Sequence, residues 1–93
     1  MKRLDLIVPE LELDTVRRTL RKAGVPGYSV LRHVTGYGSG GVVSEELEVS
    51  GGGANAHVIV FCEPELLRNL RPLLRPLLNT YGGVAFVGDA EPL

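Results

Sequence analysis

The sequence contains little cysteine and few aromatic residues, with Cys62 as its single cysteine, no tryptophan, and aromatic side chains at 5% of 93 residues. One cysteine excludes an internal disulfide and fits a reducing compartment. Scarce aromatic residues argue against a base-stacking platform for nucleic acid. Ten basic and eleven acidic residues leave a net charge of −1, so no overall basic field attracts nucleic acid or an anionic membrane.

Long apolar runs are also missing. No window approaches the ~20 apolar residues of a membrane span. Lys2 and Arg3 are not followed by the apolar stretch of a signal peptide. We therefore expect a cytoplasmic protein without membrane insertion. A chain of 93 residues forms one small domain, here residues 1–93, and domains of this size often gain stability by oligomerising.

Hydrophobic periodicity predicts six main elements. Leu4, Leu6 and Val8 alternate with more polar positions in a strand that stops at Pro9. Helical spacing follows over 12–23, with Gly24 as a C-terminal cap. The remaining elements are strands over 28–35, 56–62 and 84–87 and a helix over 64–79.

The second predicted helix contains two prolines, Pro72 and Pro76. An interior proline costs about 3 kcal/mol and kinks a helix. We therefore expect a bend or a restart near Arg71, with Pro72 opening a second short helix.

The order β-α-β-β-α-β is the ferredoxin-like pattern, an α+β fold with a four-stranded antiparallel sheet and both helices on one face. The nearly all-apolar third strand, and apolar residues on both faces of the first strand, leave a second sheet face to cover. We expect this face to be buried between subunits of a homotrimer.

Glycine is the strongest local signal. Seven of the twelve glycines lie between Gly36 and Gly53, in a long loop that contains no cation. Glycine lets backbone N–H groups approach a ligand closely. A second glycine turn, Tyr81-Gly82-Gly83, precedes the last strand. The two turns either meet across a subunit boundary as an anion or nucleotide site, or are plain turns.

The sequence contains few residues arranged as catalytic groups or as metal ligands. No nucleophile stands beside a base, so we expect no enzyme activity. His33, His57 and Cys62 are the candidate ligands of a divalent metal, without further donors at metal-ligand spacing. A loop cluster of glutamates is expected to be a solvated surface: Glu45, Glu46 and Glu48.

The chain resembles the PII-like signalling proteins through three short motifs: Gly27-Tyr28-Ser29-Val30, Gly36-Tyr37-Gly38 and the ending Gly82-Gly83-Val84-Ala85-Phe86-Val87. It is more similar to the branch associated with bicarbonate transport and carboxysomes than to the nitrogen-regulating branch. The resemblance implies a homotrimer that binds adenine nucleotides in the clefts between subunits. It also implies that the long loop, the T-loop at about 38–55, docks onto a partner such as a membrane transporter or a carboxysome-related protein.

The resemblance also implies site residues. Ser29 and Val30 would line the adenine pocket. The base of the T-loop and the second turn would face the phosphates, through Gly36, Tyr37, Gly38 and Ser39 on one side and Tyr81, Gly82 and Gly83 on the other.

Departures from the nitrogen-regulating pattern concern charge. Ser39 stands where those proteins have a basic residue, and Val84 where they have a phosphate-binding lysine. ADP or AMP is therefore expected to fit better than magnesium-bound ATP, with bicarbonate as a further ligand. Arg32, Arg3 or His33 would supply positive charge. The second strand is also one residue longer than in those proteins.

Two other functions share this topology. A trimeric metal-binding protein of the CutA type would use His33, His57 and Cys62 as ligands. A structural oligomer without a ligand would use the long loop only as an interaction arm.

Overall fold

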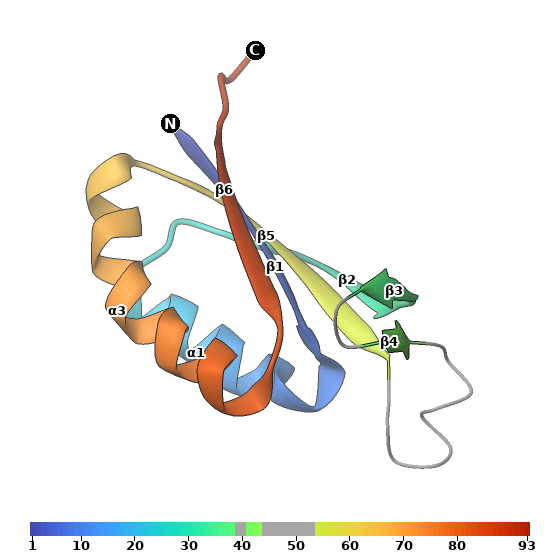
Figure 1. The fold of residues 1–93 in the computed structure, drawn as a ribbon. Helices are drawn as coiled ribbons and strands as arrows, with labels where there is room; N and C mark the ends of the chain where they lie inside the picture. The colour runs from blue at the N-terminus through green and yellow to red at the C-terminus, as the bar shows by residue number, and fades with distance from the viewer. Residues whose placement is uncertain (39–40, 44–53) are drawn as a thin grey trace.

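The computed structural model describes residues 1–38, 41–43 and 54–93, and the expected T-loop, Ser39 and the loop glutamates included, lies mostly outside this part. Figure 1 shows two helices packed on one side of a twisted sheet. In chain order the elements are β1 (Lys2–Pro9), the short 3-10 helix η1 (Glu10–Glu12), α1 (Leu13–Ala23), β2 (Ser29–Val34), β3 (Gly36–Gly38), β4 (Gly41–Val43), β5 (Asn55–Cys62), α3 (Pro64–Tyr81) and β6 (Val84–Asp89).

The main sheet has the strand order β2-β5-β1-β6, and all its pairs are antiparallel. The predicted α+β fold, ferredoxin-like with a four-stranded antiparallel sheet and two helices on one face, is therefore confirmed. A small hairpin of β3 and β4, which the sequence did not predict, follows β2.

The core lies between the helices and one face of the sheet. From Leu4 onward β1 alternates between buried and less buried residues, and β5 does so along its whole length. The buried strand side chains meet leucines and a valine from the two helices, and the largest fully buried ones are Leu6, Leu20, Leu70, Val58, Val60 and Cys62. This face accounts for the hydrophobic burial that holds the fold together.

Helix α1 ends where the sequence predicts. Gly24 takes the left-handed conformation at φ 86°, and its N–H donates to the carbonyl of Arg21 at 3.0 Å. A residue with a Cβ is strained there, which explains the glycine.

Helix α3 is one continuous element from Pro64 to Tyr81, so the expected second short helix at Pro72 is wrong. Pro72 and Pro76 are four residues apart and both are exposed. The carbonyl groups that lose an N–H partner to these prolines therefore lie on the solvent side, where water replaces the lost hydrogen bonds. The other face of the helix keeps its packing through Leu67, Leu70 and Leu74.

The turn between α3 and β6 is fixed by its second glycine. Gly83 has φ 116°, and a Cβ built on it would lie 2.7 Å from the carbonyl oxygen of Ile7. The close approach to β1 and the left-handed backbone both require glycine here. Gly27, by contrast, has open space around its Cα and no left-handed φ.

We predict that Gly83→Ala lowers the free energy of unfolding by at least about 2 kcal/mol, because strain and overlap act together. Urea denaturation at fixed protomer concentration measures this. Gly27→Ala is the matched control and should change stability by less than about 1 kcal/mol. Equal effects of the two substitutions would contradict this role of Gly83.

Candidate ligand site at the glycine turns

The two glycine turns lie at the same end of the main sheet. The last residue of β2, Val34, is opposite Asn55 at the start of β5, and Asn55 is opposite Pro9 at the end of β1. Ile7, near the end of β1, is opposite Val84, the first residue of β6. Two strands separate β2 from β6, so the strands from which the two turns extend are about 14 Å apart across the sheet, at roughly 4.8 Å per strand spacing.

The first turn opens directly into solvent. Gly36 and Gly38 pair with Val43 and Gly41 in the β3–β4 hairpin, and among the described residues no atom would obstruct a Cβ at either glycine. The Tyr37 side chain is 85% exposed. Space for a ligand therefore exists beside Gly36, Tyr37 and Gly38, whereas Ser39 lies outside the described residues.

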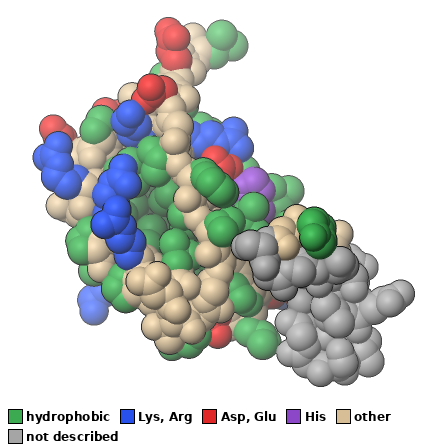
Figure 2. Space-filling view, in the orientation of Figure 1, with side chains coloured by type: hydrophobic (Ala, Val, Ile, Leu, Met, Phe, Trp, Pro, Cys, Tyr) green, Lys and Arg blue, Asp and Glu red, His purple; other side chains and the backbone are tan. Residues whose placement is uncertain are grey.

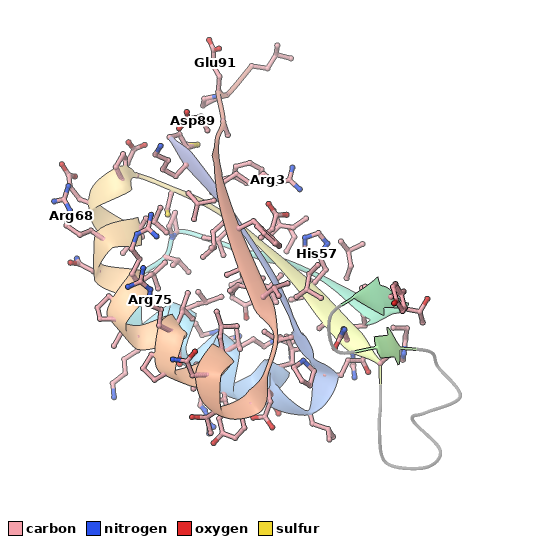
Figure 3. The ribbon with its side chains drawn as sticks, in the orientation of Figure 1. Arg3, His57, Arg68, Arg75, Asp89 and Glu91 are labelled. Carbon is pink, nitrogen blue, oxygen red and sulfur yellow. The ribbon has the colours of Figure 1, made fainter. Side chains whose placement is uncertain are left out.

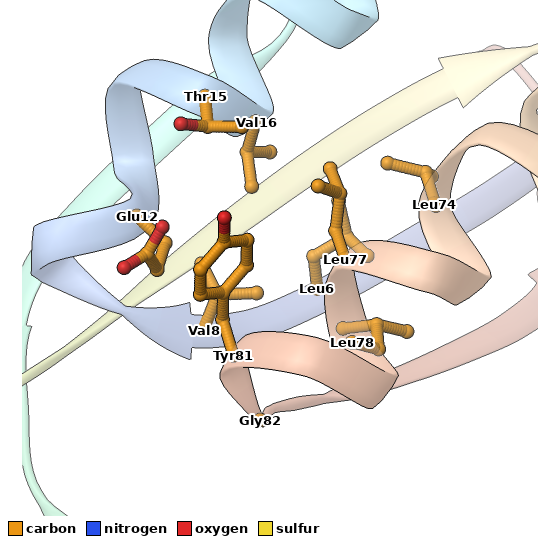
Figure 4. Close-up of a pocket in the computed structure, with 10 residues that line it drawn as sticks. All are labelled: Leu6, Val8, Glu12, Thr15, Val16, Leu74, Leu77, Leu78, Tyr81 and Gly82. Atoms are coloured by element: carbon orange, nitrogen blue, oxygen red, sulfur yellow. The ribbon is translucent and has the colours of Figure 1, made fainter.

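The second turn also stabilises the fold, because it ends α3. The N–H of Gly82 donates to the carbonyl of Leu78 at 2.9 Å and caps α3. Tyr81 and Gly82 border a cavity of only about 10 Å³ between the helices, which Figure 4 shows. This gap barely admits one water molecule, so a nucleotide cannot bind inside it. Any ligand at this turn lies on the surface.

β2 contains a β-bulge. Leu31 is opposite His57, but Val34 rather than His33 is opposite Asn55, so Arg32 and His33 together occupy the space of one residue. His33 has φ 59°. Bulges re-aim side chains next to functional sites. Here the bulge lies immediately before the first glycine turn.

A buried carboxylate holds this bulge. Glu10, whose side chain is 8% exposed, accepts a hydrogen bond from the backbone N–H of His33. Its Oε1 atom also lies 3.7 Å from Nε of Arg32 and 3.5 Å from Nδ1 of His33. The N–H of Glu10 donates to the carbonyl of Ala54 at 3.0 Å. Glu10 therefore joins the end of β1 to both ends of the loop that carries the first turn.

Ser29 and Val30 point to opposite faces of the sheet. Ser29 is exposed and opposite Ile59, whereas Val30 is opposite Val58 and packs against the core. The side chain of Ser29 is therefore open to a ligand or a neighbouring subunit. Val30 offers mainly its backbone.

The face of the sheet away from the helices, called here the open sheet face, is largely apolar. Its apolar side chains come from all four strands and are half-buried or exposed: Ile7, Leu31, Ile59, Phe61, Val84 and Phe86. Contiguous exposed apolar surface of this kind marks an interaction site.

A polar row crosses the open sheet face. Arg3 donates two hydrogen bonds to Asp5, both at 3.0 Å, and Nε2 of His57 donates to Oδ1 of Asp5 at 2.8 Å. The hydrogen bonds from Arg3, and to a smaller extent His57, lower the pKa of Asp5 below its usual value, against the opposing effect of partial burial. The guanidinium of Arg3 also lies over the ring of Phe61, 5.7 Å from its centroid. Figure 3 shows Arg3 and His57 on this side of the sheet.

The three candidate metal ligands do not converge. His57 is on the open sheet face, and Cys62 faces the helices, where burial raises its thiol pKa. His33 sits in the bulge beside Glu10. Within the described ranges, no three histidine, cysteine or acidic residues form a cluster suited to a metal ion.

Two features of the site were not recognised from sequence. Glu10 and His33 are 23 positions apart, and Asp5 and His57 are 52 apart. No local motif signals either pair, because each depends on strand register.

Comparison with known proteins gives two results. The family model described as nitrogen regulatory protein P-II matches residues 1–93. CPII from Thiomonas intermedia K12, a nitrogen regulatory PII-like protein bound to ADP, AMP and bicarbonate, is 28% identical, with a TM-score of 0.85 over 96% of this chain and 84% of that one.

Two further solved structures of CPII from the same organism are similar. The form bound to ADP and bicarbonate is 28% identical, with a TM-score of 0.83 over 96% of this chain and 84% of that one. The apo form, 24% identical with a TM-score of 0.77 over 96% and 87%, shows the shared fold. No curated protein matches the chain.

We predict that Asp5→Asn lowers the free energy of unfolding by about 1 kcal/mol at neutral pH, because the ion pair and its charge-assisted hydrogen bonds weaken. A lowered native pKa stabilises the fold above the usual carboxyl value of about 4, and this contribution disappears as pH falls further through the native pKa. The difference between variant and parent should therefore vanish in acid. Urea denaturation across this pH range measures it, and Asp14→Asn, the same substitution at a carboxylate 88% exposed, is the matched control and should change stability by less than about 0.5 kcal/mol. A difference that persists in acid would contradict the assignment.

Proposed function

This chain belongs to the nitrogen regulatory protein P-II family, whose members are non-enzymatic signalling proteins, and we propose that it is an adenine-nucleotide sensor. ADP or AMP binds in clefts between the subunits of a homotrimer, with bicarbonate as a second ligand. Occupancy is signalled through the T-loop at about 38–55. The proposed setting is the cytoplasm, where adenine nucleotides are available.

The observation that carries this proposal is the placement of both glycine turns at one end of the sheet. A separation of about 14 Å between the strands that carry them is too wide for the backbone amides of both turns to contact one phosphate group. A neighbouring protomer that docks against this end would supply the missing wall. The site is then formed at a subunit boundary.

The open sheet face supports the trimer. PII proteins trimerise, and this chain leaves apolar side chains from four strands without a helix to cover them. Their burial between protomers would be driven by the same hydrophobic effect that holds the core. Three protomers whose open faces meet would also bring their sheet ends together.

The ligand class follows from charge and from the relative. CPII binds ADP, AMP and bicarbonate. Here Arg32 and His33 are brought by the bulge to the approach of the first turn. These two residues are suited to a small anion or to one or two phosphates rather than to a triphosphate with its metal ion.

We assign different residues to the adenine and to the anionic groups of the ligand. The side chain of Ser29 and the backbone of Val30 meet the adenine. Phosphates or bicarbonate meet the two turns and Arg32, through Gly36, Tyr37, Gly38, Ser39, Tyr81, Gly82 and Gly83.

Signalling requires a difference in affinity. A ligand shifts the loop between two arrangements only if it binds one of them more tightly. Glu10 is placed to transmit this difference, since it contacts both Arg32 and the backbone of His33. An anion that draws Arg32 away from Glu10 changes the bulge from which the loop begins. The proposed receiver is a bicarbonate transporter or another carbon-fixation component.

We predict that calorimetric titration shows binding of ADP and AMP at least about tenfold tighter than binding of magnesium-bound ATP, for the charge reason given above. Parallel titrations with bicarbonate, alone and after ADP, test the second ligand. If no nucleotide and no bicarbonate produces heat or a thermal shift at millimolar concentration, the sensor function is wrong.

A charge placed at the first turn tests the location. Gly38→Glu should weaken ADP binding by about tenfold or more, because the carboxylate repels phosphate where a side chain meets no protein atom. Asn69→Glu, an equal change of charge on the exposed surface of α3, should bind ADP like the parent. If both variants bind normally, the ligand does not occupy this turn.

A separate substitution tests assembly. Phe86→Asp, at a side chain 66% exposed on the open sheet face, should convert the trimer into monomers in light scattering, because it would bury a charge in the interface. Leu73→Asp, at a side chain 47% exposed on α3, should leave the trimer intact. A parent protein of monomeric mass would remove both the trimer and its intersubunit site.

A further inference from the structure

A second surface of interest lies on the helix side of the molecule, between α3 and β6. A groove of about 200 Å³ runs there. Its floor is apolar and is formed by Leu4, Leu67, Leu74, Leu78, Ala85 and Val87. In Figure 2 the groove is visible as a green hollow between a blue band and the tan strand. None of these residues belongs to the glycine turns.

Arginines of α3 border this groove. Arg71 and Arg75 line it directly, and Arg68 lies one turn earlier on the same stripe of the helix. Spacings of three and four residues place all three side chains on one face, next to the leucines of the floor. Figure 3 shows Arg68 and Arg75 projecting from that helix.

These arginines make no ion pair within the part of the chain that the structure describes. No described carboxylate lies within 4 Å of Arg68, Arg71 or Arg75, whereas Arg3, Arg17 and Arg32 each have one. This leaves a row of three guanidinium groups beside an apolar groove without an ion pair to any described residue. It is complementary to a ligand that carries both carboxylates and an apolar side chain.

We propose that the groove between α3 and β6 docks an acidic segment of a partner protein, with an apolar side chain in the groove and flanking carboxylates on Arg71 and Arg75. Arginine binds carboxylates through two parallel hydrogen bonds, which fixes orientation as well as charge. The volume admits one or two leucine-sized side chains. A concave groove of this size fits a peptide side chain, whereas a bilayer surface would need a flat or convex apolar face.

This docking surface is independent of the nucleotide site. It gives the protein a contact on the helix layer in addition to any contact made by the T-loop. A partner engaged at both places gains avidity, provided that one molecule spans the two surfaces.

The test uses the full chain and a short fluorescein-labelled peptide in which glutamates flank two leucines. Fluorescence anisotropy should show saturable binding that weakens as salt is added, since the contact is partly ionic. Arg71→Glu with Arg75→Glu should weaken it by about tenfold or more, because two attractive pairs become repulsive. The matched control is Arg18→Glu with Lys22→Glu, two exposed residues of α1 with the same spacing and the same change of charge, and it should bind like the parent.

Further measurements test the apolar contact separately and distinguish a peptide from a membrane as the ligand of the groove. A peptide with alanine in place of the leucines should bind at least about tenfold more weakly. Val87→Ser should reduce binding of the leucine peptide but not of the alanine peptide. The protein should not sediment with vesicles of phosphatidylglycerol and phosphatidylcholine. Vesicle binding that depends on Arg71 and Arg75 would assign the surface to a membrane and overturn the proposal. Absence of peptide binding, or equal loss in the α1 control, would also overturn it.

Discussion

The antiparallel pairing of β1 with β5 along the whole length of both strands is the constraint on which the rest of the structure depends. Its register places Leu4, Leu6 and Val8 beside Val60, Val58 and Ala56 on the helix side, where they form the core. The same register places Asp5 near His57 on the other side. A shift by one residue would exchange the two faces, so register decides core, open sheet face and polar row together.

The pairing of β1 with β5 also positions the two glycine turns, because the residues that hold them lie at the ends of these strands. Because β1 and β5 are neighbours, Glu10 after β1 can accept the N–H of His33 in β2 and donate its own N–H to Ala54 before β5. Glu10 thereby holds the bulge at Arg32 and His33 and the base of the glycine-rich hairpin. The opposite turn is anchored by Gly83 against the carbonyl of Ile7. Both turns are therefore tied to the end of β1, while their described outer surfaces stay open.

Much of this fold could be predicted from sequence, because alternation in the strands and three- and four-residue spacing in the helices are local signals. The order of elements, the cap at Gly24 and the glycine turns follow from such signals. The continuity of α3 could not be predicted, since it depends on Pro72 and Pro76 facing solvent. The β-bulge at Arg32 and His33 could not be located either, because its partner Glu10 is distant in sequence.

The sequence by itself determined the buried faces of the strands and helices and the glycine cap at Gly24, since these follow from local composition and periodicity. Only the tertiary structure decided how charges are distributed. A net charge of −1 predicts no strongly charged surface, yet α3 presents Arg68, Arg71 and Arg75 together beside an apolar groove, and Arg3, Asp5 and His57 form a row on the open sheet face. The reason is geometric: composition sums charges over the chain, whereas helix stripes and strand register decide which of them become neighbours.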